Sequence, residues 1–248
     1  KCLITTGPPF TCHLVGLALK AVTGLPWVAE FRDPWSLDHK YRVLRNGPSD
    51  RLESWLIRQV MTRADRVVSV TSRMTDDAIK EHPELSQTKF VTLTSGFDPA
   101  DYDDVSWQRP VGPPVVFAYF GTFYHGRTPE PFLRALKSLI DDGTLRKTEI
   151  RVRFVGLVEH AEGQSLDAML RDLDLESVVT VEGPVSRREA LRQTLETHVV
   201  LVLNEQHPTQ IPFKLYEALG AGAIVLNVGS AGAVGDVLTW QPFEGGER

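Results

Sequence analysis

Four side chains with functional potential follow directly on an apolar run near the start of the chain. The stretch PWVAEFRDPWSL reads as a buried strand that ends in Arg32, Asp33, Pro34 and Trp35. A tight turn explains this run, with proline fixing the backbone and aspartate bonding to it. A binding site explains it equally well, because ligands of parallel sheets lie beyond the carboxyl ends of strands. In that interpretation Arg32 and Asp33 orient a polar ligand and Trp35 offers a flat apolar face.

A second candidate lies upstream, where TTGPPFTCH leads from a strand into a helix. Thr11 is of a type that caps helices, and His13 lies in the first turn. The N-terminus of a helix attracts anions, so His13 could face a phosphate or an acidic acceptor. A solvated histidine on a capped helix is the simpler alternative.

The stretch YFGTFYHGRTPE repeats this geometry in the second half of the chain. Gly121 closes a strand and permits close approach of a ligand to the backbone. Thr122, His125 and Arg127 then precede the helix that Thr128-Pro129 opens. We interpret this loop as a site for a phosphate, with Arg127 as the counter-charge.

The most informative stretch is PTQIPFKLYEALGAGAIVL, which reads as a helix followed by a strand. Pro212 begins the helix, and Leu215 and Leu219 are expected to share its core side. Lys214 and Glu217 are three residues apart and are expected together on the opposite side. A cation for a phosphate and a carboxylate for two ribose hydroxyls would suit nucleotide binding. A surface Lys–Glu pair is the alternative.

The elements that would position these residues alternate between strand and helix along the whole chain. This alternation predicts an α/β protein with parallel sheets and helices on both faces. The proline-rich stretch from Asp98 to Pro114 has no periodicity and reads as a linker. We therefore expect two Rossmann-like domains facing across a cleft. Their expected ranges are residues 1–98, a linker at 99–114, and residues 115–248.

Composition limits the partners of the chain. The formal net charge of −5 argues against nucleic acid as a partner. The two cysteines cannot form a disulfide framework, which favours a reducing, cytoplasmic compartment. No apolar run reaches the length of a membrane span. The seven histidines show no ligand spacing, and Asp172 and Asp174 lie in helical sequence, so we expect no metal.

Five stretches occur in an order and spacing that resemble the GT-B glycosyltransferases of family 4. They are GPPFTCHLVGLALK, FRDPWSL, SGFDPADY, YFGTFYHGR and PFKLYEALGAGAIVL. Members of this family are retaining transferases that use nucleotide-sugar donors. They also carry a further N-terminal stretch and a returning C-terminal segment, so we expect the N-terminal domain and the C-terminal end to be incomplete here.

The resemblance implies roles at individual positions. Glu217 matches the second glutamate of the family's E-x7-E motif, which binds the donor ribose, and Lys214 lies near the donor phosphates. The first glutamate of the motif falls at Thr209, which weakens any inference about the sugar. Gln210 or backbone amides could hold the sugar hydroxyls instead. The other matches are Gly121 and Arg127 in the first donor loop, Arg32 and Asp33 in the acceptor-side loop, and His13 in the N-terminal cleft.

The reaction that the resemblance implies is transfer of a glycosyl group from a nucleoside diphosphate to a glycan or lipid-linked acceptor. Lys214, Arg127 and helix N-termini would stabilise the charge that develops on the leaving phosphate, without a metal or other cofactor. Peripheral contact with the inner face of the membrane would follow from a lipid-linked acceptor. Two alternatives remain open: a nucleotide-sugar epimerase of the same architecture, and a non-catalytic or truncated chain that binds nucleotide.

Overall fold

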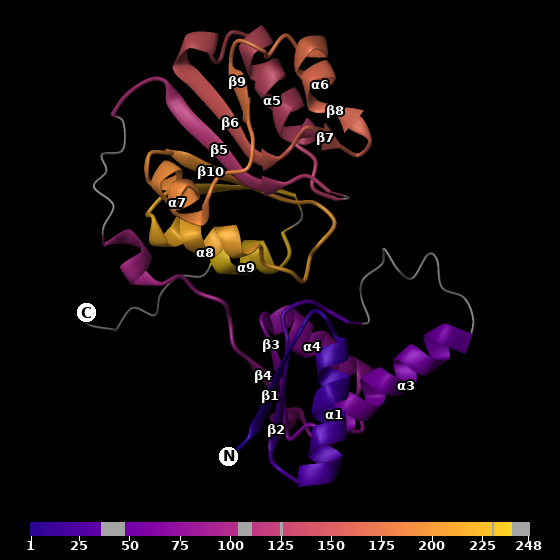
Figure 1. Ribbon diagram of the computed structural model, residues 1–248. Helices are drawn as coiled ribbons and strands as arrows, with labels where there is room; N and C mark the ends of the chain where they lie inside the picture. The colour runs from indigo at the N-terminus through magenta and orange to yellow at the C-terminus, as the bar shows by residue number, and fades with distance from the viewer. Residues whose placement is uncertain (36–47, 104–110, 125, 230, 240–248) are drawn as a thin grey trace. The chain divides into compact units, whose positions relative to one another are not determined.

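The chain folds into two compact α/β units, as the alternation of strands and helices predicts. The computed structural model describes residues 1–35, 48–103, 111–124, 126–229 and 231–239. The two units are Lys1–Ser95 and Gly96–Arg248 (Figure 1). Each unit is built on a parallel sheet, and each is described by itself below.

Unit 1 contains a four-stranded parallel sheet in the order β1-β2-β3-β4. Its strands and helices alternate along the chain, apart from a short 3-10 helix before the last strand. The elements are β1 (Leu3–Gly7), α1 (Thr11–Thr23), β2 (Trp27–Phe31), α3 (Pro48–Arg63), β3 (Arg66–Ser69), α4 (Ser72–Glu81), η1 (Gln87–Lys89) and β4 (Phe90–Thr92).

The core of unit 1 forms around β2, whose alternate residues Trp27, Ala29 and Phe31 are buried. Helix α1 packs on β1 and β2 and buries His13 and Gly16. The space for Gly16 is narrow, because a Cβ atom there would lie 2.7 Å from the Trp27 ring. The expected cap at Thr11 is wrong. The helix begins after Phe10, which provides no side-chain cap, and Thr11 is its first residue.

Unit 2 contains a five-stranded parallel sheet in the order β11-β10-β5-β6-β9 and a small hairpin formed by β7 and β8. It opens with the 3-10 helix η2 (Pro99–Tyr102). The remaining elements are β5 (Val115–Thr122), α5 (Glu130–Asp141), η3 (Lys147–Glu149), β6 (Ile150–Leu157), β7 (His160–Ala161), β8 (Gln164–Ser165), α6 (Leu166–Asp172), β9 (Val179–Glu182), α7 (Arg187–Leu195), β10 (Val199–Asn204), α8 (Phe213–Gly220), β11 (Ile224–Gly229) and α9 (Ala233–Thr239).

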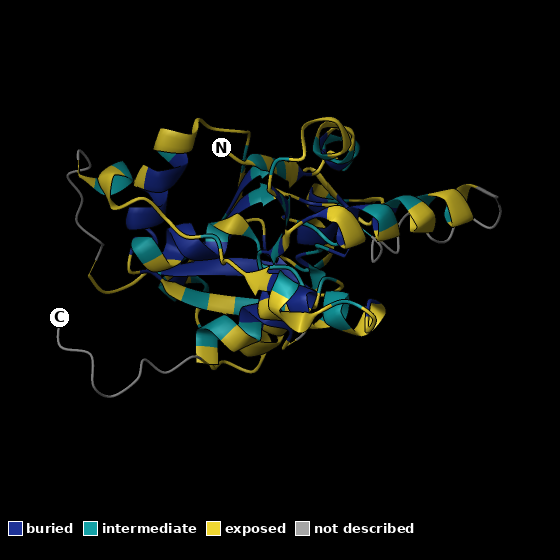
Figure 2. Ribbon diagram, turned by 90° about the horizontal axis from the view of Figure 1, so that it is seen from below, coloured by how far each residue is buried: buried dark blue, intermediate teal, exposed yellow. Residues whose placement is uncertain are grey.

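Helices cover both faces of the unit 2 sheet. Figure 1 shows α5 and α6 on one face and α7, α8 and α9 on the other. Tyr119 of β5 packs with the α5–α6 layer, whereas its neighbours Ala118 and Phe120 pack with Ala190 of α7. Every residue of the inner strand β10 is buried, and exposed positions lie on the outward sides of the helices (Figure 2). This explains why β10 reads as a continuous apolar run.

The order of the strands creates a switch point between β5 and β10. The chain builds the sheet from β5 toward β9, and then crosses to the other side of β5 to add β10 and β11. Strand β10 pairs with β5 through Val199 and Val200, and both strands continue beyond this pairing. The carboxyl ends of strands at a switch point are where open α/β sheets bind ligands.

Part of the stretch expected as a linker is ordered and packs on unit 2. Asp98 accepts a hydrogen bond from the Ala100 amide at 3.0 Å and so begins η2. Phe97 lies so close to α8 that a Cβ atom at Gly220 would be 2.6 Å from its ring. Tyr102 stacks edge-on against Phe97. Residues 104–110 of the expected linker lie outside the described residues.

Candidate functional site

A depression of about 220 Å³ lies at the carboxyl edge of the unit 2 sheet. Its walls come from the segment after β5, from the end of β10 and from the end of β11. The lining residues are Gly126, Thr128, Pro131, Leu203, Asn204, Glu205, Val228 and Gly229. The depression therefore lies at the switch point, where the topology predicts a ligand site.

Close backbone packing shapes this depression. A Cβ atom at Gly229 would lie 2.5 Å from the Asn204 carbonyl carbon, so only glycine fits beside the end of β10. The buried Asn204 amide donates to the carbonyl oxygens of His207 and Gln210, at 3.1 and 3.4 Å. It thereby fixes the loop that carries Thr209 and Gln210 between β10 and α8.

The first predicted donor loop borders the same depression. Gly121 lies within β5 rather than at its end, and the exposed Thr122 is the last residue of that strand. The Arg127 guanidinium lies 4.5 Å from the centre of the Tyr124 ring, and within the described part of the chain its buried Nε atom has no hydrogen-bond partner. His125 lies outside the described residues. Helix α5 begins at Glu130, one residue after the predicted Thr128-Pro129 pair.

Glu217 lies between two cations. Its Oε2 atom accepts a hydrogen bond from Lys214 Nζ at 2.8 Å, and its Oε1 atom lies 3.4 Å from Arg187 Nε. Lys214 is in the first turn of α8, and Arg187 is the first residue of α7. Both helices follow strands of one parallel sheet, so both cations lie at its carboxyl edge, where helix N-termini add partial positive charge. The cluster can bind an anion next to a carboxylate.

The helical-wheel expectation for α8 is partly wrong. Lys214 and Glu217 are in contact as expected, and Leu215 is fully buried. Glu217, however, is 3% exposed and Leu219 is 41% exposed, so the carboxylate is on the buried side of the helix. The expectation was wrong because it considered only the contact of α8 with the sheet. Helix α7 and η2 also pack against α8, and they cover a side of the helix that contact with the sheet alone would leave open.

Asp101 of η2 extends this charge cluster. Its two carboxylate oxygens accept hydrogen bonds from Arg187 Nη1 and Nη2 at 3.0 and 2.6 Å. The Arg187 guanidinium holds the pKa of Asp101 below its usual range. Beside it, the Tyr102 hydroxyl donates to the Glu217 carbonyl oxygen at 2.8 Å. Burial raises the pKa of Tyr102 to about 12, so the hydroxyl remains a donor at neutral pH.

In unit 1, the predicted acceptor-side residues gather beyond β1 and β2. Arg32 Nη2 donates to the Pro8 carbonyl oxygen at 3.2 Å, which joins the two strand-end loops. Trp35 stacks on Phe10 with a centroid distance of 5.0 Å, and its indole nitrogen donates to Glu53 at 3.1 Å. One face of the indole is therefore already covered. Asp33 is half-buried in the same turn.

His13 is buried rather than solvated. Its Nδ1 atom lies 2.8 Å from Thr5 Oγ1, which also accepts a hydrogen bond from Trp27 at 2.9 Å. The imidazole packs against Phe31 and lies near Phe10. Burial lowers the pKa of His13 to about 4, against an opposing effect of Glu30. The ring is therefore neutral at pH 7.

Sequence reasoning missed Arg187, Asp101 and the Asn204–Glu205 pair. Asn204 and Glu205 could have been found from the sequence, because they stand at the end of a buried strand. The same pattern was the reason for selecting Arg32. Arg187 is the first residue of α7, where Ser186 accepts a capping hydrogen bond from the Glu189 amide, and a charged residue at a helix start is common. Asp101 was assigned to the linker, whose packing on α7 no local pattern reveals.

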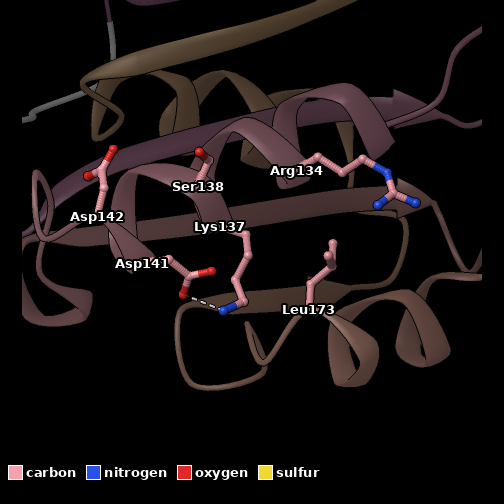
Figure 3. Close-up of a pocket in the computed structure, with 6 residues that line it drawn as sticks. All are labelled: Arg134, Lys137, Ser138, Asp141, Asp142 and Leu173. Carbon is pink, nitrogen blue, oxygen red and sulfur yellow. Dashed lines mark hydrogen bonds and ion pairs between the residues drawn. The ribbon is translucent and has the colours of Figure 1, made fainter.

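A larger depression of about 480 Å³ lies elsewhere on unit 2, against α5 (Figure 3). Lys137 and Asp141 pair with each other along the helix, and Arg134 pairs with Glu130. Because these charges are exposed or half-buried and already paired one turn apart, they are typical of a solvated helix face. We do not assign this surface a function. Its lining residues are Arg134, Lys137, Ser138, Asp141, Asp142 and Leu173.

Two further properties hold for the described part of the chain. There, no three His, Cys, Asp or Glu side chains come together in a way that could hold a metal ion. The expectation that the chemistry needs no metal stays a prediction. In the same residues, no helix is long and apolar enough to cross a membrane.

Comparison with known proteins identifies the fold. No family model matches the sequence, and no curated protein matches it. Among solved structures, HepE of Anabaena in complex with UDP superposes with a TM-score of 0.72 at 14% identity. The alignment covers 96% of this chain and 62% of HepE, and the same protein has been solved with UDP-glucose.

Two further structures agree with this match. The lipopolysaccharide outer core galactosyltransferase WaaB has a TM-score of 0.59 at 19% identity. The alignment covers 96% of this chain and 59% of WaaB. Sucrose-phosphate synthase of Thermosynechococcus elongatus has a TM-score of 0.60 at 15% identity. The alignment covers 92% of this chain and 56% of the synthase. All three neighbours are GT-B glycosyltransferases, so the chain has that fold. Membership of family 4 stays a prediction.

Proposed function

We propose that this chain is part of a glycosyltransferase that moves a sugar from a nucleoside-diphosphate donor to a glycan or lipid-linked acceptor. The observation that carries the proposal is the cluster in which Glu217 lies between Lys214 and Arg187 at the carboxyl edge of the unit 2 sheet. A carboxylate can accept hydrogen bonds from two ribose hydroxyls, and a cation on a helix N-terminus suits a phosphate. The GT-B fold supports this assignment, as do the UDP and UDP-glucose complexes of HepE.

The donor would occupy the depression at the ends of β5, β10 and β11. Gly121 and Thr122 would allow the phosphates to approach the backbone, and Gln210 would contact the sugar in place of the carboxylate that Thr209 lacks. During transfer, negative charge grows on the leaving phosphate. Lys214 and Arg127 would stabilise this charge, as pre-positioned cations do in a water-poor site. We further propose retention of the anomeric configuration and membership of family 4.

The acceptor would bind to unit 1 at the joined ends of β1 and β2. Arg32 and Asp33 would orient its polar groups, and the aromatic group of Phe10 and Trp35 would contact a sugar ring. His13 would act as a neutral hydrogen-bonding group, because its pKa of about 4 leaves it uncharged at pH 7. Action in the cytoplasm, with contact to the inner membrane face for a lipid-linked acceptor, completes the proposal.

The test is a thermal-shift panel of UDP, GDP, ADP and the corresponding nucleotide sugars. A ligand present at a hundred times its Kd adds about 2.7 kcal/mol to the free energy of unfolding. For a unit of this size that corresponds to roughly 5–10 °C in Tm. We expect one base to give this shift, both as the diphosphate and as its sugar. Absence of a shift with every nucleotide would contradict the proposal.

A further inference from the structure

We propose that Asp101 sets the nucleotide affinity of unit 2 by binding both Nη atoms of Arg187, which limits Arg187 to one 3.4 Å contact with Glu217 Oε1 and leaves this oxygen able to accept a ribose hydrogen bond. The inference rests on the proposed function of Glu217 and adds two residues, Asp101 and Arg187, that have no assigned role. Both act through Glu217, so both are positioning residues.

The distances show which carboxylate holds Arg187. Asp101 accepts two hydrogen bonds from the guanidinium, at 3.0 and 2.6 Å. Glu217 has one contact with Arg187, at 3.4 Å. Bidentate pairs between arginine and a carboxylate are stronger than single contacts. The guanidinium is therefore bound to Asp101 and only lies near Glu217.

The two oxygens of Glu217 differ as a result. Oε2 accepts a hydrogen bond from Lys214 at 2.8 Å, whereas Oε1 has only the longer contact to Arg187. An ionised carboxylate has about four acceptor positions, so Oε1 keeps capacity for a hydroxyl donor. The Glu217 side chain is 4% exposed, but the Arg187 and Lys214 side chains over it are 53% and 37% exposed. In this proposal the ribose approaches Glu217 past these two exposed side chains.

Without Asp101, Arg187 would lose its main partner. The nearest remaining carboxylate is Glu217, so the guanidinium would move onto Oε1 and compete with the ribose. Asp101 lies on η2, the first element of unit 2 along the chain, so in this proposal the start of unit 2 takes part in forming the nucleotide site. The inference therefore assigns η2 a role in binding.

The experiment measures UDP affinity by calorimetry in the full chain and in Asp101→Ala, Arg187→Gln and the double variant. We expect Asp101→Ala to weaken binding about tenfold, as for loss of one hydrogen bond to a charged group. Arg187→Gln removes one cation of the cluster, and it should lose less affinity than Asp101→Ala because no guanidinium can then cover Glu217 Oε1. The double variant should match Arg187→Gln, because no guanidinium remains to cover Glu217. Asp101→Glu should restore binding.

A salt bridge that only fastens η2 to α7 gives a different pattern, because both single variants and the double variant would then lose affinity equally. A second probe, 2′,3′-dideoxyuridine diphosphate, separates the two cases further. Its affinity should not respond to Asp101→Ala, since it lacks the hydroxyls that Glu217 would accept. Equal losses in the three variants, or an equal effect on both probes, would overturn the inference. If the unchanged protein binds none of UDP, GDP and ADP, the proposed function fails as well.

Discussion

Glu217 is a buried carboxylate that contacts two cations. Desolvation of a charged group is costly, and here Lys214 and Arg187 offset that cost. Both cations are substantially exposed, so the cluster still has access to water and to a ligand. Under the proposed function, the same arrangement would both stabilise Glu217 and prepare it for binding.

Glu217→Gln should separate these two roles. The amide keeps the shape of the side chain but removes the charge that faces the two cations. We expect the free energy of unfolding to fall by about 1–2 kcal/mol, less than for a fully buried pair because both cations stay hydrated. The affinity for the nucleoside diphosphate that gives the thermal shift should fall by at least about tenfold, from loss of a charge-assisted hydrogen bond. Urea unfolding and calorimetry give the two values.

The matched control for this variant is Glu176→Gln, at an exposed position of unit 2. It changes the formal charge equally and should leave both stability and nucleotide affinity unchanged. A Glu217→Gln protein that binds that nucleotide normally would remove the ribose role, even if its stability fell as expected.

His13 should make unit 1 sensitive to acid. Its pKa of about 4 in the fold lies below the usual value of 6.5, so between these values the unfolded chain binds more protons than the folded one. Stability is therefore complete above pH 6.5 and falls as the pH drops toward 4. At pH 5 we expect a loss of about 2 kcal/mol relative to pH 7.5. Urea unfolding at both pH values, followed by tryptophan fluorescence, measures it.

The comparison variant for this prediction is His13→Gln, which cannot titrate. Its stability should be lower at pH 7.5, because the packing against Phe31 is lost, but should change less between the two pH values. An equal pH dependence in both proteins would show that other groups cause the acid sensitivity.

At the residue scale, the sequence predicted the contact between neighbouring candidate residues, but it did not predict how deeply they are buried or which distant residues they contact. The contact between Lys214 and Glu217 was predictable, because residues three apart on a helix are neighbours. The burial of Glu217 and its contact with Arg187 depend on the packing of α7 and η2 against α8. Such contacts join residues 30 or more positions apart, and no local periodicity contains them.

At the scale of elements, β5 and β6 meet where β6 leaves no room for a side chain. Gly121 and Gly156 are direct partners in the parallel register, and Gly156 has a φ of 132°. A Cβ atom on Gly156 would overlap with the Gly121 carbonyl oxygen. The pair fixes how closely the ends of these strands approach beside the donor loop.

Gly156→Ala should therefore destabilise unit 2 by about 3 kcal/mol or more, since the added methyl group meets backbone atoms that cannot rotate away. Gly183→Ala is the comparison, because a Cβ atom there has nothing within 4 Å. It should change stability by less than about 0.5 kcal/mol. Thermal unfolding of both variants decides the matter, and similar Tm values would refute the packing argument.

Most of the strands and helices were predictable, because their periodicities differ clearly. The apolar run of β10 and the alternating burial of β2 follow from how deeply each strand lies in its sheet. The N-terminus of α1 was misjudged at Thr11, since a potential cap does not by itself fix where a helix begins. The 3-10 helix η2 escaped prediction because short 3-10 helices lack a periodic pattern.

At the scale of the whole molecule, the sequence predicted two α/β units with parallel sheets, and the structure confirms this fold. The strand order of unit 2 then places a depression at the switch point between β5 and β10. That order depends on long-range pairing between strands and could not be read from the chain. The central claim is that this edge, and not the larger depression against α5, binds the nucleotide.

Hydrogen–deuterium exchange tests this claim most directly, measured with and without a saturating concentration of the nucleoside diphosphate that gives the thermal shift. We predict slower exchange in peptides covering residues 121–132 and 204–217, where backbone amides line the depression or precede the Glu217 cluster. Peptides covering residues 134–142, which line the larger depression, should exchange at the same rate in both conditions. Protection of residues 134–142 without protection at 121–132 or 204–217 would contradict the account.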